Sequence, residues 1–234
     1  MSKTTMNKSH KSECNNLLKT RMNMKKFLSL LILFLSAINI LPAQTCPDSN
    51  HPHAIDLGIG VKFACCNVGA SSPEQYGSHY AWGETKIKNS YKTLNYKHGG
   101  NNSYREYKNI GSDISGTQYD VAHVMWQGNW HMPTKEELEL LKDRCKKEWV
   151  TYKRVEGIRF IGPNGYSIFL PASGSRWYDD TNYVGYSGNY WSSTYSTQKS
   201  NGYGDAYFLG FDNSWIGMSY GDRASGSTVR PIAK

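Results

Sequence analysis

A change in hydrophobic period near residue 150 constrains the fold of this chain more than any other feature of its sequence. Before it, Leu138 and Leu141 are spaced as on one helical face, behind the string TKEE in which Thr134 and Glu137 can form a capping box. After it, short runs of β-branched and aromatic residues alternate with Gly, Asn, Asp and Ser, as in the turn string GPNG. A helix followed by antiparallel strands is therefore predicted.

We expect the helix that begins at Thr134 to carry four apolar residues on one face: Leu138, Leu141, Cys145 and Trp149. A shorter helix is predicted at residues 120–126, a hairpin or two strands at residues 54–69, and a long surface excursion at residues 86–118. Near the C-terminus, AYFLGF, SWIGMSY and TVRPIA predict strands within text that otherwise resembles loops. The result is an α+β fold with one or two helices early, followed by short antiparallel strands with long loops.

The N-terminal part of the chain predicts export. Residues 24–44 contain two lysines, a short apolar run and a small residue near the end, as in a secretory signal peptide. The apolar run is shorter than a membrane-spanning helix requires. The alternatives to a cleaved signal peptide are an uncleaved N-terminal anchor and a lipoprotein anchor at Cys46. We therefore expect a secreted or outer-surface protein without a membrane-spanning segment in its mature chain.

Three segments follow from this interpretation. Residues 1–43 form an N-terminal extension and signal peptide, residues 44–54 a polar leader, and residues 55–234 a single domain large enough for its own core. The first 43 residues hold seven of the 27 Lys and Arg and one of the 19 Asp and Glu, so the net charge of +8 falls to +2 without them. This small charge argues against nucleic acid as a partner.

The cysteines predict disulfide bonding in an oxidising compartment. Cys46, Cys65, Cys66 and Cys145 follow the signal segment, and three pairings are formally possible. Neighbouring side chains point to opposite faces of an extended strand, which disfavours a bond between Cys65 and Cys66. One bridge reaching Cys145 and one reaching Cys46 are left, and buried free thiols are the alternative.

No motif in the sequence predicts catalysis or a bound cofactor. A nucleophile elbow, a phosphate loop, a paired-histidine zinc motif and a calcium loop are all missing. His51 and His53 are too weak a pair for a metal site, and Asp179 with Asp180 is more typical of a solvated turn than of catalytic carboxylates. We expect a non-enzymatic protein without a cofactor or metal.

The C-terminal segment points instead to a binding surface. Of the 46 residues at positions 177–222, 26 are Tyr, Ser, Gly or Asn. These types dominate antibody binding sites, because Tyr offers a large rigid contact with a polar tip while Ser, Gly and Asn supply adaptable loops. Tyr also favours strands, which accounts for Tyr190 and Tyr207 beside apolar strings.

The predicted ligand-binding side chains combine stacking area with polar contacts. The stacking candidates are Trp177, Tyr178, Tyr183, Tyr186, Tyr203, Trp215 and Tyr220, and the polar candidates are Asp179, Asn213 and Arg223. The expected partner is a glycan or a protein at the cell surface, since aromatic rings stack on sugars and are enriched at the energetic centres of protein interfaces.

Several strings, in a constant order, resemble one family. IDLGIGVKFACCNVGASSPEQYG, HYAWGET, GNWHMPTKEELELL, GPNGYSIFLPASG, GNYWSST and STVRPI are similar to strings of the Fibrobacter succinogenes major paralogous domain, a module of secreted and surface proteins of Bacteroidetes. The likeness covers residues 55–232. It implies a C-type-lectin-like mixed fold, similar also to that of the formylglycine-generating enzymes, with a long variable loop region.

The resemblance also implies roles for single residues. Cys66 and Cys145 stand where such domains commonly carry cysteine, which implies a disulfide bond between them. The framework positions, expected to anchor the core and the loops, are Trp82, Trp130, Pro133, Trp191 and Arg230. The chain departs from the pattern at Phe63, where Trp is usual, and at His131, where Arg is usual. The cysteines of the formylglycine-generating enzymes have no matching motif, so no activity is implied.

The sequence therefore predicts an exported, non-enzymatic binding module that uses its Tyr-, Ser-, Gly- and Asn-rich C-terminal face. Two other functions stay open. A structural subunit of a surface filament or matrix would use its strands and leader for assembly. A variable receptor diversified by a retroelement would scatter Asn codons into Tyr, Ser, Asp and Gly at positions such as Asn182, Asp205 and Ser214.

Overall fold

The computed structural model describes residues 54–99, 107–198 and 204–233. All of them belong to the second of the two units into which the chain divides, Gln44–Lys234. The predicted signal segment, most of the leader and Tyr203 lie outside the described residues. Within the described ranges, no helix has the length and apolar character needed to cross a membrane.

The domain is mostly β-structure, so the expected α+β, C-type-lectin-like fold with early helices is wrong. Strands and bridges take up 40% of the described residues and helices 11%. The described part of the chain holds two α-helices, α2 (Val121–Trp126) and α3 (Lys135–Arg144), and a 3-10 turn, η1 (Thr93–Asn95). Two strands, β1 (Ala54–Asp56) and β2 (Lys62–Ala64), precede all three.

Strand pairing explains why the main helix is shorter than predicted. It begins as expected, because Thr134 accepts a hydrogen bond from the Glu137 amide and Glu137 accepts one from the Thr134 amide. It ends before Cys145, which is extended at φ −101°. The next residues form strand β4 (Lys146–Tyr152) and carry Trp149 with them, since pairing with the following strand outweighs the modest helix propensity of this segment.

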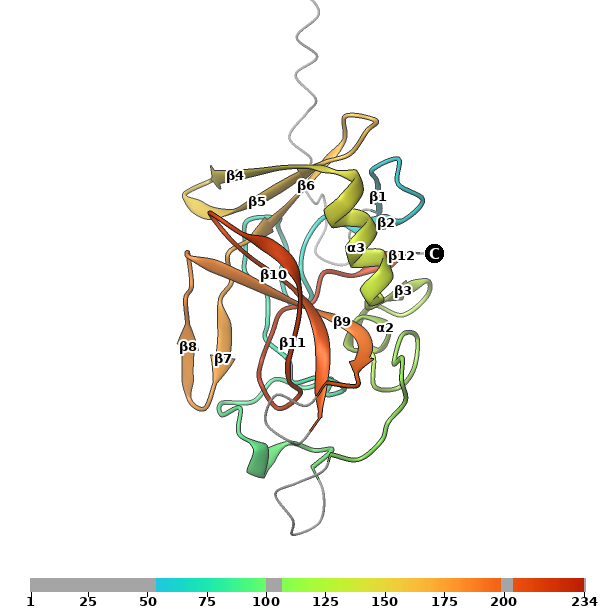
Figure 1. Cartoon of the computed structure of the whole chain (residues 1–234), viewed down its shortest axis with the longest axis vertical. Helices are drawn as coiled ribbons and strands as arrows, with labels where there is room; N and C mark the ends of the chain where they lie inside the picture. Colours follow the sequence, from blue (N-terminus) through green and yellow to red (C-terminus); the bar gives the residue numbers. More distant parts are fainter. Residues whose placement is uncertain (1–53, 100–106, 199–203, 234) are drawn as a thin grey trace, which may run out of the picture. The chain divides into compact units, whose positions relative to one another are not determined.

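Four short strands join distant parts of the chain in one antiparallel sheet. Its order is β1–β2–β12–β3, with β3 at Trp130–His131 and β12 at Ile232–Ala233. Ile232 pairs with both Phe63 and His131. The last strand of the chain therefore lies inside the sheet, between an early and a central segment (Figure 1).

A meander of three strands follows α3, as the change of period predicts. Strands β4, β5 (Val155–Ile161) and β6 (Ser167–Pro171) pair in sequence order, and the GPNG string connects β5 to β6. The structure confirms these predictions. They could be made from the sequence because each depends on residues that are close along the chain.

The C-terminal part holds two more antiparallel sheets. The first is a hairpin of β7 (Ser175–Trp177) and β8 (Asp180–Asn182). The second has the order β11–β10–β9, with β9 at Ser187–Ser196, β10 at Asp205–Asp212 and β11 at Ile216–Asp222. Strands β7, β8 and β9 all lie in a stretch of sequence that resembles loops by its composition.

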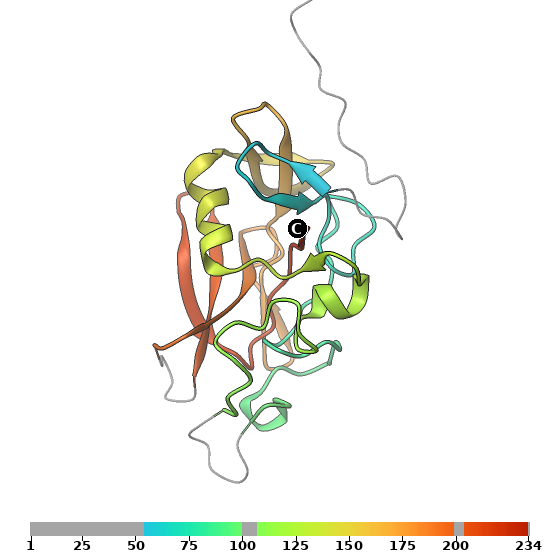
Figure 2. The ribbon, with the colours of Figure 1, turned by 90° about the vertical axis from the view of Figure 1, so that its right-hand side faces the viewer.

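The two faces of the β9–β11 sheet differ in chemistry. Leu209 and Met218 pair directly and face the core, and α3 packs along this inner face (Figure 2). Side chains alternate between faces along a strand, so the residues next to Leu209 on β10 and next to Met218 on β11 face the other side of the sheet. We call outer face the part of that side near the β10–β11 turn, formed by Ser187, Asn189, Gly210, Gly217 and Ser219.

The buried core accounts for most of the framework positions that the resemblance implies. Trp82, Trp191 and Arg230 are buried, and so is Pro133, whereas Trp130 is half-buried. Trp82 and Trp191 belong to one apolar cluster, and their ring nitrogens donate to backbone carbonyls of facing strands and loops. These side chains therefore hold loops against the core, as expected.

Arg230 shows how the core accommodates a positive charge. Its guanidinium donates hydrogen bonds to the carbonyls of Ala64, Cys65 and Phe169 and to Oδ1 of Asn67, at 2.8 to 3.1 Å. These acceptors replace the water that burial removes, although burial still lowers the pKa of Arg230. The C-terminal segment is thereby tied to β2 and β6.

The disulfide bond predicted between Cys66 and Cys145 is wrong, because both thiols are free and buried. Cys66 Sγ donates to the Ala70 carbonyl at 3.3 Å, and burial raises the pKa of this thiol. The neighbouring Cys65 takes part in a disulfide bond instead. Cys46, the other cysteine for which a bridge was predicted, lies outside the described residues.

Candidate ligand-binding surface

The ten predicted binding residues do not form one surface. Arg223 is buried, and Tyr220 lies on β11 away from the others. We call hairpin tip the group at the β7–β8 turn, formed by Trp177, Tyr178 and Asp179. We call aromatic edge the group that lies between β8 and β9 and at the β10–β11 turn, formed by Tyr183, Tyr186, Asn213 and Trp215.

Strand pairing brings the aromatic edge together from two loops. Ser187 pairs with Asp212, so the loop that ends at Tyr186 lies beside the β10–β11 turn that carries Trp215. The exposed fractions of the side chains are 71% for Tyr183, 76% for Tyr186 and 50% for Trp215. Single exposed apolar residues are common, but a group of large rings in one place is typical of an interaction surface.

One carboxylate closes the β10–β11 turn. Asp212 Oδ1 accepts hydrogen bonds from the amides of Ser214 (2.7 Å) and Trp215 (2.8 Å) and from the Ser214 hydroxyl (2.8 Å). The Asp212 amide donates to the Trp215 carbonyl at 2.9 Å. The Ser214 amide and hydroxyl, with the Trp215 amide, hold the pKa of Asp212 below its usual value. Such a side-chain-closed turn fixes the backbone from which Trp215 projects.

The Trp215 ring lies against two glycines of the outer face. A Cβ atom at Gly217 would stand 2.5 Å from Trp215 Cζ2, and one at Gly210 would stand 3.0 Å from Cζ3. A larger residue at Gly217 would therefore displace the indole, so glycine is what allows the ring to approach the backbone this closely. One side of the ring is covered by the sheet, and half of its surface is open to solvent.

The loop with the two tyrosines is also held by backbone hydrogen bonds. The Gly185 amide donates to the Ala172 carbonyl at 2.8 Å, and the Tyr183 carbonyl accepts from the amides of Tyr186 and Ser187 at 3.0 Å. Tyr183 has φ +60°, a left-handed conformation that costs a non-glycine residue about 1 kcal/mol. The surrounding fold holds this strained backbone, a situation that is common at ligand sites.

The hairpin tip is attached to the segment that follows Glu84. Tyr91 and Tyr178 exchange two backbone hydrogen bonds, of 2.7 and 3.0 Å. The rings of Trp177 and Tyr178 meet edge to face with their centroids 5.7 Å apart. The Lys92 ammonium lies 3.4 Å from the Asp179 carboxylate and 5.6 Å from the centroid of the Tyr178 ring. The exposed rings of the hairpin tip therefore lie next to charged side chains.

Tyr220 faces another way. It pairs directly with Tyr207 across β10 and β11, and the two rings meet edge to face at 6.4 Å. Three positions separate Tyr220 from Gly217, so its side chain lies on the inner side of the sheet while the Trp215 ring lies on the outer face. Tyr220 is therefore not part of the aromatic edge.

Arg223 lies in the core, so it does not offer the polar ligand contact predicted for it. It is 2% exposed, and its guanidinium donates to the Tyr96 hydroxyl and to the Lys108 carbonyl, both at 3.0 Å. The guanidinium carbon stands 4.7 to 5.8 Å from the centroids of four rings. We call arginine cage these four residues around Arg223: Trp82, Tyr96, Tyr107 and Tyr195.

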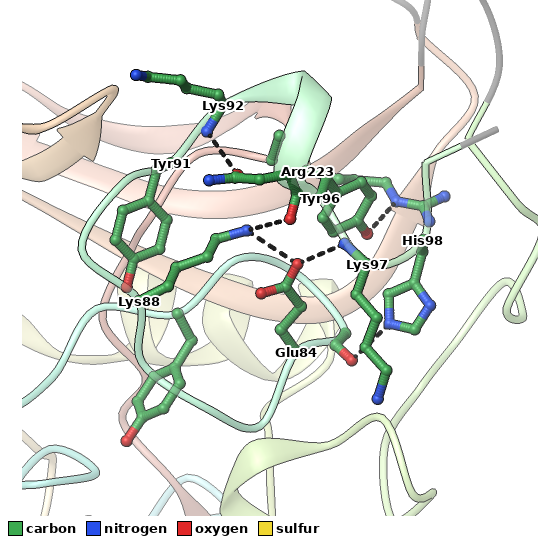
Figure 3. Close-up of polar contacts among 12 residues, drawn as sticks. Glu84, Lys88, Tyr91, Lys92, Tyr96, Lys97, His98 and Arg223 are labelled. Carbon is green, nitrogen blue, oxygen red and sulfur yellow. Dashed lines mark hydrogen bonds and ion pairs between the residues drawn. The ribbon is translucent and has the colours of Figure 1, made fainter. Parts of the chain in front are cut away.

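The arginine cage continues into a polar network that holds the segment from residue 84 to residue 98 (Figure 3). The Tyr96 hydroxyl donates to the Trp82 carbonyl at 2.6 Å. Glu84 accepts hydrogen bonds from the Lys88 ammonium at 2.9 Å and from the Lys97 amide at 2.8 Å. The excursion predicted over the surface is therefore anchored in the core through Tyr96.

The residues that support Trp215 were not predicted from the sequence. Gly210 and Gly217 hold the ring and Asp212 closes its turn, but their strings predicted strands only. A signal for Asp212 was present, because an Asp followed by Asn-Ser is typical of a turn in which the carboxylate binds backbone amides two residues on. The two glycines gave no signal, since their role depends on the register between strands.

The chemistry available at the aromatic edge is stacking and hydrogen bonding. Among the described residues, no group of three or more His, Cys, Asp or Glu is arranged to hold a metal ion. Burial raises the pKa of Tyr190, a core residue, to about 12, and burial also lowers the pKa of His79. His79 contacts the Ser173 carbonyl at 3.1 Å and is not part of the aromatic edge.

Comparisons with known proteins do not assign the chain to a family. No protein-family model matches the sequence, and neither curated proteins nor solved structures give a significant match. The resemblance to the Fibrobacter succinogenes major paralogous domain therefore stays a prediction.

Proposed function

We propose that the protein is an exported, non-enzymatic binding module that recognises a glycan or a protein through the aromatic edge. The observation that carries the proposal is the exposure of three rings, Tyr183, Tyr186 and Trp215, on two loops that strand pairing places side by side. Aromatic side chains supply much of the binding energy at interfaces, and few of them are needed. We also propose, from the strings shared with it, that the chain belongs to the Fibrobacter succinogenes major paralogous domain family.

The order of both loops supports this proposal. Asp212 closes the β10–β11 turn, and the Gly185 amide fixes the other loop to the Ala172 carbonyl. Loops that are already ordered lose less conformational freedom on binding, so more of the contact energy is available for affinity. Trp and Tyr have few torsions to immobilise, which adds to the same effect.

The proposal is tested with a triple variant, Tyr183→Ala, Tyr186→Ala and Trp215→Ala, probed on a glycan array and on an array of extracellular proteins. We expect the purified wild-type protein to bind and the triple variant to lose binding by a factor of about 100 or more, since each lost ring costs over about 1 kcal/mol. The matched control, Trp177→Ala with Tyr178→Ala, removes two exposed rings of the hairpin tip and should leave binding intact. Equal binding by the wild-type protein and the triple variant would contradict the proposal.

The second candidate function is that of a structural subunit. It is favoured by two exposed aliphatic side chains, Ile87 and Leu94, on the segment that contacts β7 through hydrogen bonds from Arg176. Exposed apolar groups beside the hairpin tip could support assembly. Sedimentation velocity distinguishes the two functions: a subunit forms concentration-dependent oligomers that Ile87→Ser with Leu94→Ser abolishes, while the triple variant of the aromatic edge still assembles.

The diversified receptor stays a prediction. Of the positions cited for it, Ser214 is exposed and Asn182 is half-buried, but Asp205 is buried at the start of β10. Variation at a buried position would disturb packing rather than alter a binding surface. The proposed binding function does not depend on diversification.

A further inference from the structure

We infer that the ligand of the aromatic edge is an uncharged glycan, and that the Trp215 ring stacks on the apolar face of one of its sugar rings. This inference rests on the proposed function, because it names the ligand class of the same surface. It is carried by the seating of the indole on the sheet and by the neutral polar side chains around it.

The seating of the ring provides a flat and fixed platform. The indole lies against the backbone of Gly210 and Gly217, and Asp212 fixes the turn from which it projects. A sugar ring presents a patch of C–H groups on one face, and it packs best against an aromatic face that is open and held in place. Trp215 meets both conditions, because one side rests on the sheet and half of its surface is exposed.

Neutral polar side chains share the outer face with this ring. Asn189 pairs directly with Gly210, so its side chain lies on the same side of the sheet. Ser187 and Ser219 occupy flanking positions of the same face, and all three residues are half-buried rather than closed off from solvent. Amide and hydroxyl groups both donate and accept hydrogen bonds, as the hydroxyl groups of a sugar require.

The two stretches of chain that form this part of the surface carry almost no charge. In the two stretches at residues 183–189 and 212–219, Asp212 is the one charged residue, and its Oδ1 already accepts three hydrogen bonds within the turn. An acidic glycan or a strongly charged peptide would therefore find little complementary charge on these two stretches. The hairpin tip differs, since Lys92 and Asp179 stand beside its rings.

The rival ligand is a peptide. Strand β11 is at the edge of its sheet, and an extended peptide could pair with its backbone. Such pairing would depend on main-chain hydrogen bonds along β11, and the glycines beneath the Trp215 ring would not be needed for it. The two ligands are therefore distinguished by a variant that displaces the ring while keeping the strand.

The experiment is calorimetric titration of the purified protein with neutral oligosaccharides of glucose, galactose, mannose, xylose and N-acetylglucosamine, and with oligogalacturonate as the acidic probe. We expect at least one neutral oligosaccharide to bind, and Trp215→Ala to weaken it by at least about tenfold. Gly217→Ala should weaken it similarly, because the new Cβ would stand 2.5 Å from the ring. Trp215→Tyr, which keeps an aromatic face, should weaken it less, and Tyr220→Ala should change it by less than about twofold.

Three outcomes would overturn the inference. Neutral glycans that bind Trp215→Ala and wild-type protein equally would exclude stacking on this ring. Binding of only oligogalacturonate, or of only a protein, that the triple variant abolishes would refute the glycan class while the proposed function stands. Binding of any ligand that survives the triple variant would refute both. Circular dichroism of Trp215→Tyr and Gly217→Ala shows whether a loss of affinity reflects the site rather than the fold.

Discussion

The arginine cage and the aromatic edge use the same kinds of side chain in opposite ways. In the cage, the Tyr96 hydroxyl donates to the Trp82 carbonyl and the Tyr107 hydroxyl donates to Asp222, each at 2.6 Å, and the rings surround a buried guanidinium. At the edge, the ring of Trp215 rests on glycines and the tyrosines reach solvent.

The difference shows that aromatic content alone does not identify a binding surface. The neighbours of a ring determine whether it is part of the core or of a surface. Rings that surround a buried charge, and whose hydroxyls have hydrogen-bond partners, are part of the core. A ring that lies on a glycine backbone keeps one side open to solvent. Both regions lie within the Tyr-rich C-terminal segment or contact it directly, so their behaviour can be compared in one protein.

The largest effect is expected from Arg223→Met. This change removes two hydrogen bonds and the charge that four rings surround, so the free energy of unfolding should fall by about 3 kcal/mol. Urea unfolding followed by tryptophan fluorescence measures it. The matched change at the edge, Tyr186→Ala, should alter the same quantity by less than about 0.5 kcal/mol. Similar losses in both variants would remove the distinction between cage and edge.

Alkaline pH should act on the buried phenols. Burial raises the pKa of Tyr96 and of Tyr107, and it raises the pKa of Tyr190 to about 12. The hydrogen bond to Asp222 raises the pKa of Tyr107 further. In the unfolded chain tyrosine titrates near pH 10, so above about pH 10 the unfolded state releases protons that the folded state keeps. The stabilisation is complete below that pH and is lost as the pH rises toward the folded values.

Urea unfolding at pH 8, 10 and 11 tests this sign. The free energy of unfolding should be steady up to about pH 9 and should fall by roughly 1 kcal/mol or more by pH 11. Tyr107→Phe should make the fall between pH 10 and pH 11 smaller, because one raised pKa is removed. Stability that rises between these two pH values would show that the buried phenols do not govern it.

A smaller effect is expected at the turn that holds Trp215. Asp212→Ala removes the acceptor for two amides and a hydroxyl, so the backbone of the turn that carries Trp215 is no longer held in place. Ligand affinity should therefore fall by about fivefold. Asp212→Asn keeps an oxygen acceptor and should restore most of the affinity. Calorimetric titration measures both, and an unchanged affinity in Asp212→Ala would mean that the turn does not pre-organise the site.

The smallest effect is expected at Tyr183, whose backbone is strained. Tyr183→Asn should raise the free energy of unfolding by about 0.5 kcal/mol, since Asn tolerates φ +60° better than Tyr, while ligand affinity falls. Tyr186→Asn is the control, because Tyr186 does not have positive φ and should gain nothing. A loss of stability in Tyr183→Asn would show that the tyrosine ring contributes more to the fold than its backbone costs.

Local signals predicted the local elements of this fold. The capping box at Thr134, the pairing of β1 with β2 and the meander from β4 to β6 each depend on residues that are close in sequence. The fold class was wrong because strands β7, β8 and β9 consist largely of polar and small residues. Strand β9 holds its place through pairing with β10 and through burial of Tyr190 and Trp191, which no local pattern reports.

The candidate site was predicted in part, for a related reason. The high content of Tyr, Ser, Gly and Asn in residues 177–222 pointed to Tyr183, Tyr186 and Trp215, which are exposed. The prediction failed for Arg223, which stands among Gly, Asp and Ala but is buried by rings from distant parts of the chain. Burial of a charged residue depends on partners that only the tertiary fold supplies.

The position of the last strand determines when the protein can finish folding. Ile232 pairs with Phe63 and His131, and Arg230 binds carbonyls of residues as early as Ala64. The contacts with Phe63 and Ala64 join residues 230–232 to residues that come more than 160 positions earlier, so they cannot form until the ribosome has added residue 232. A nascent chain without them leaves β2 unpaired on the side that β12 occupies in the sheet, so its fold is incomplete. A translocation channel transports a chain that has not finished folding. Completion of the fold after passage would then suit the proposed export.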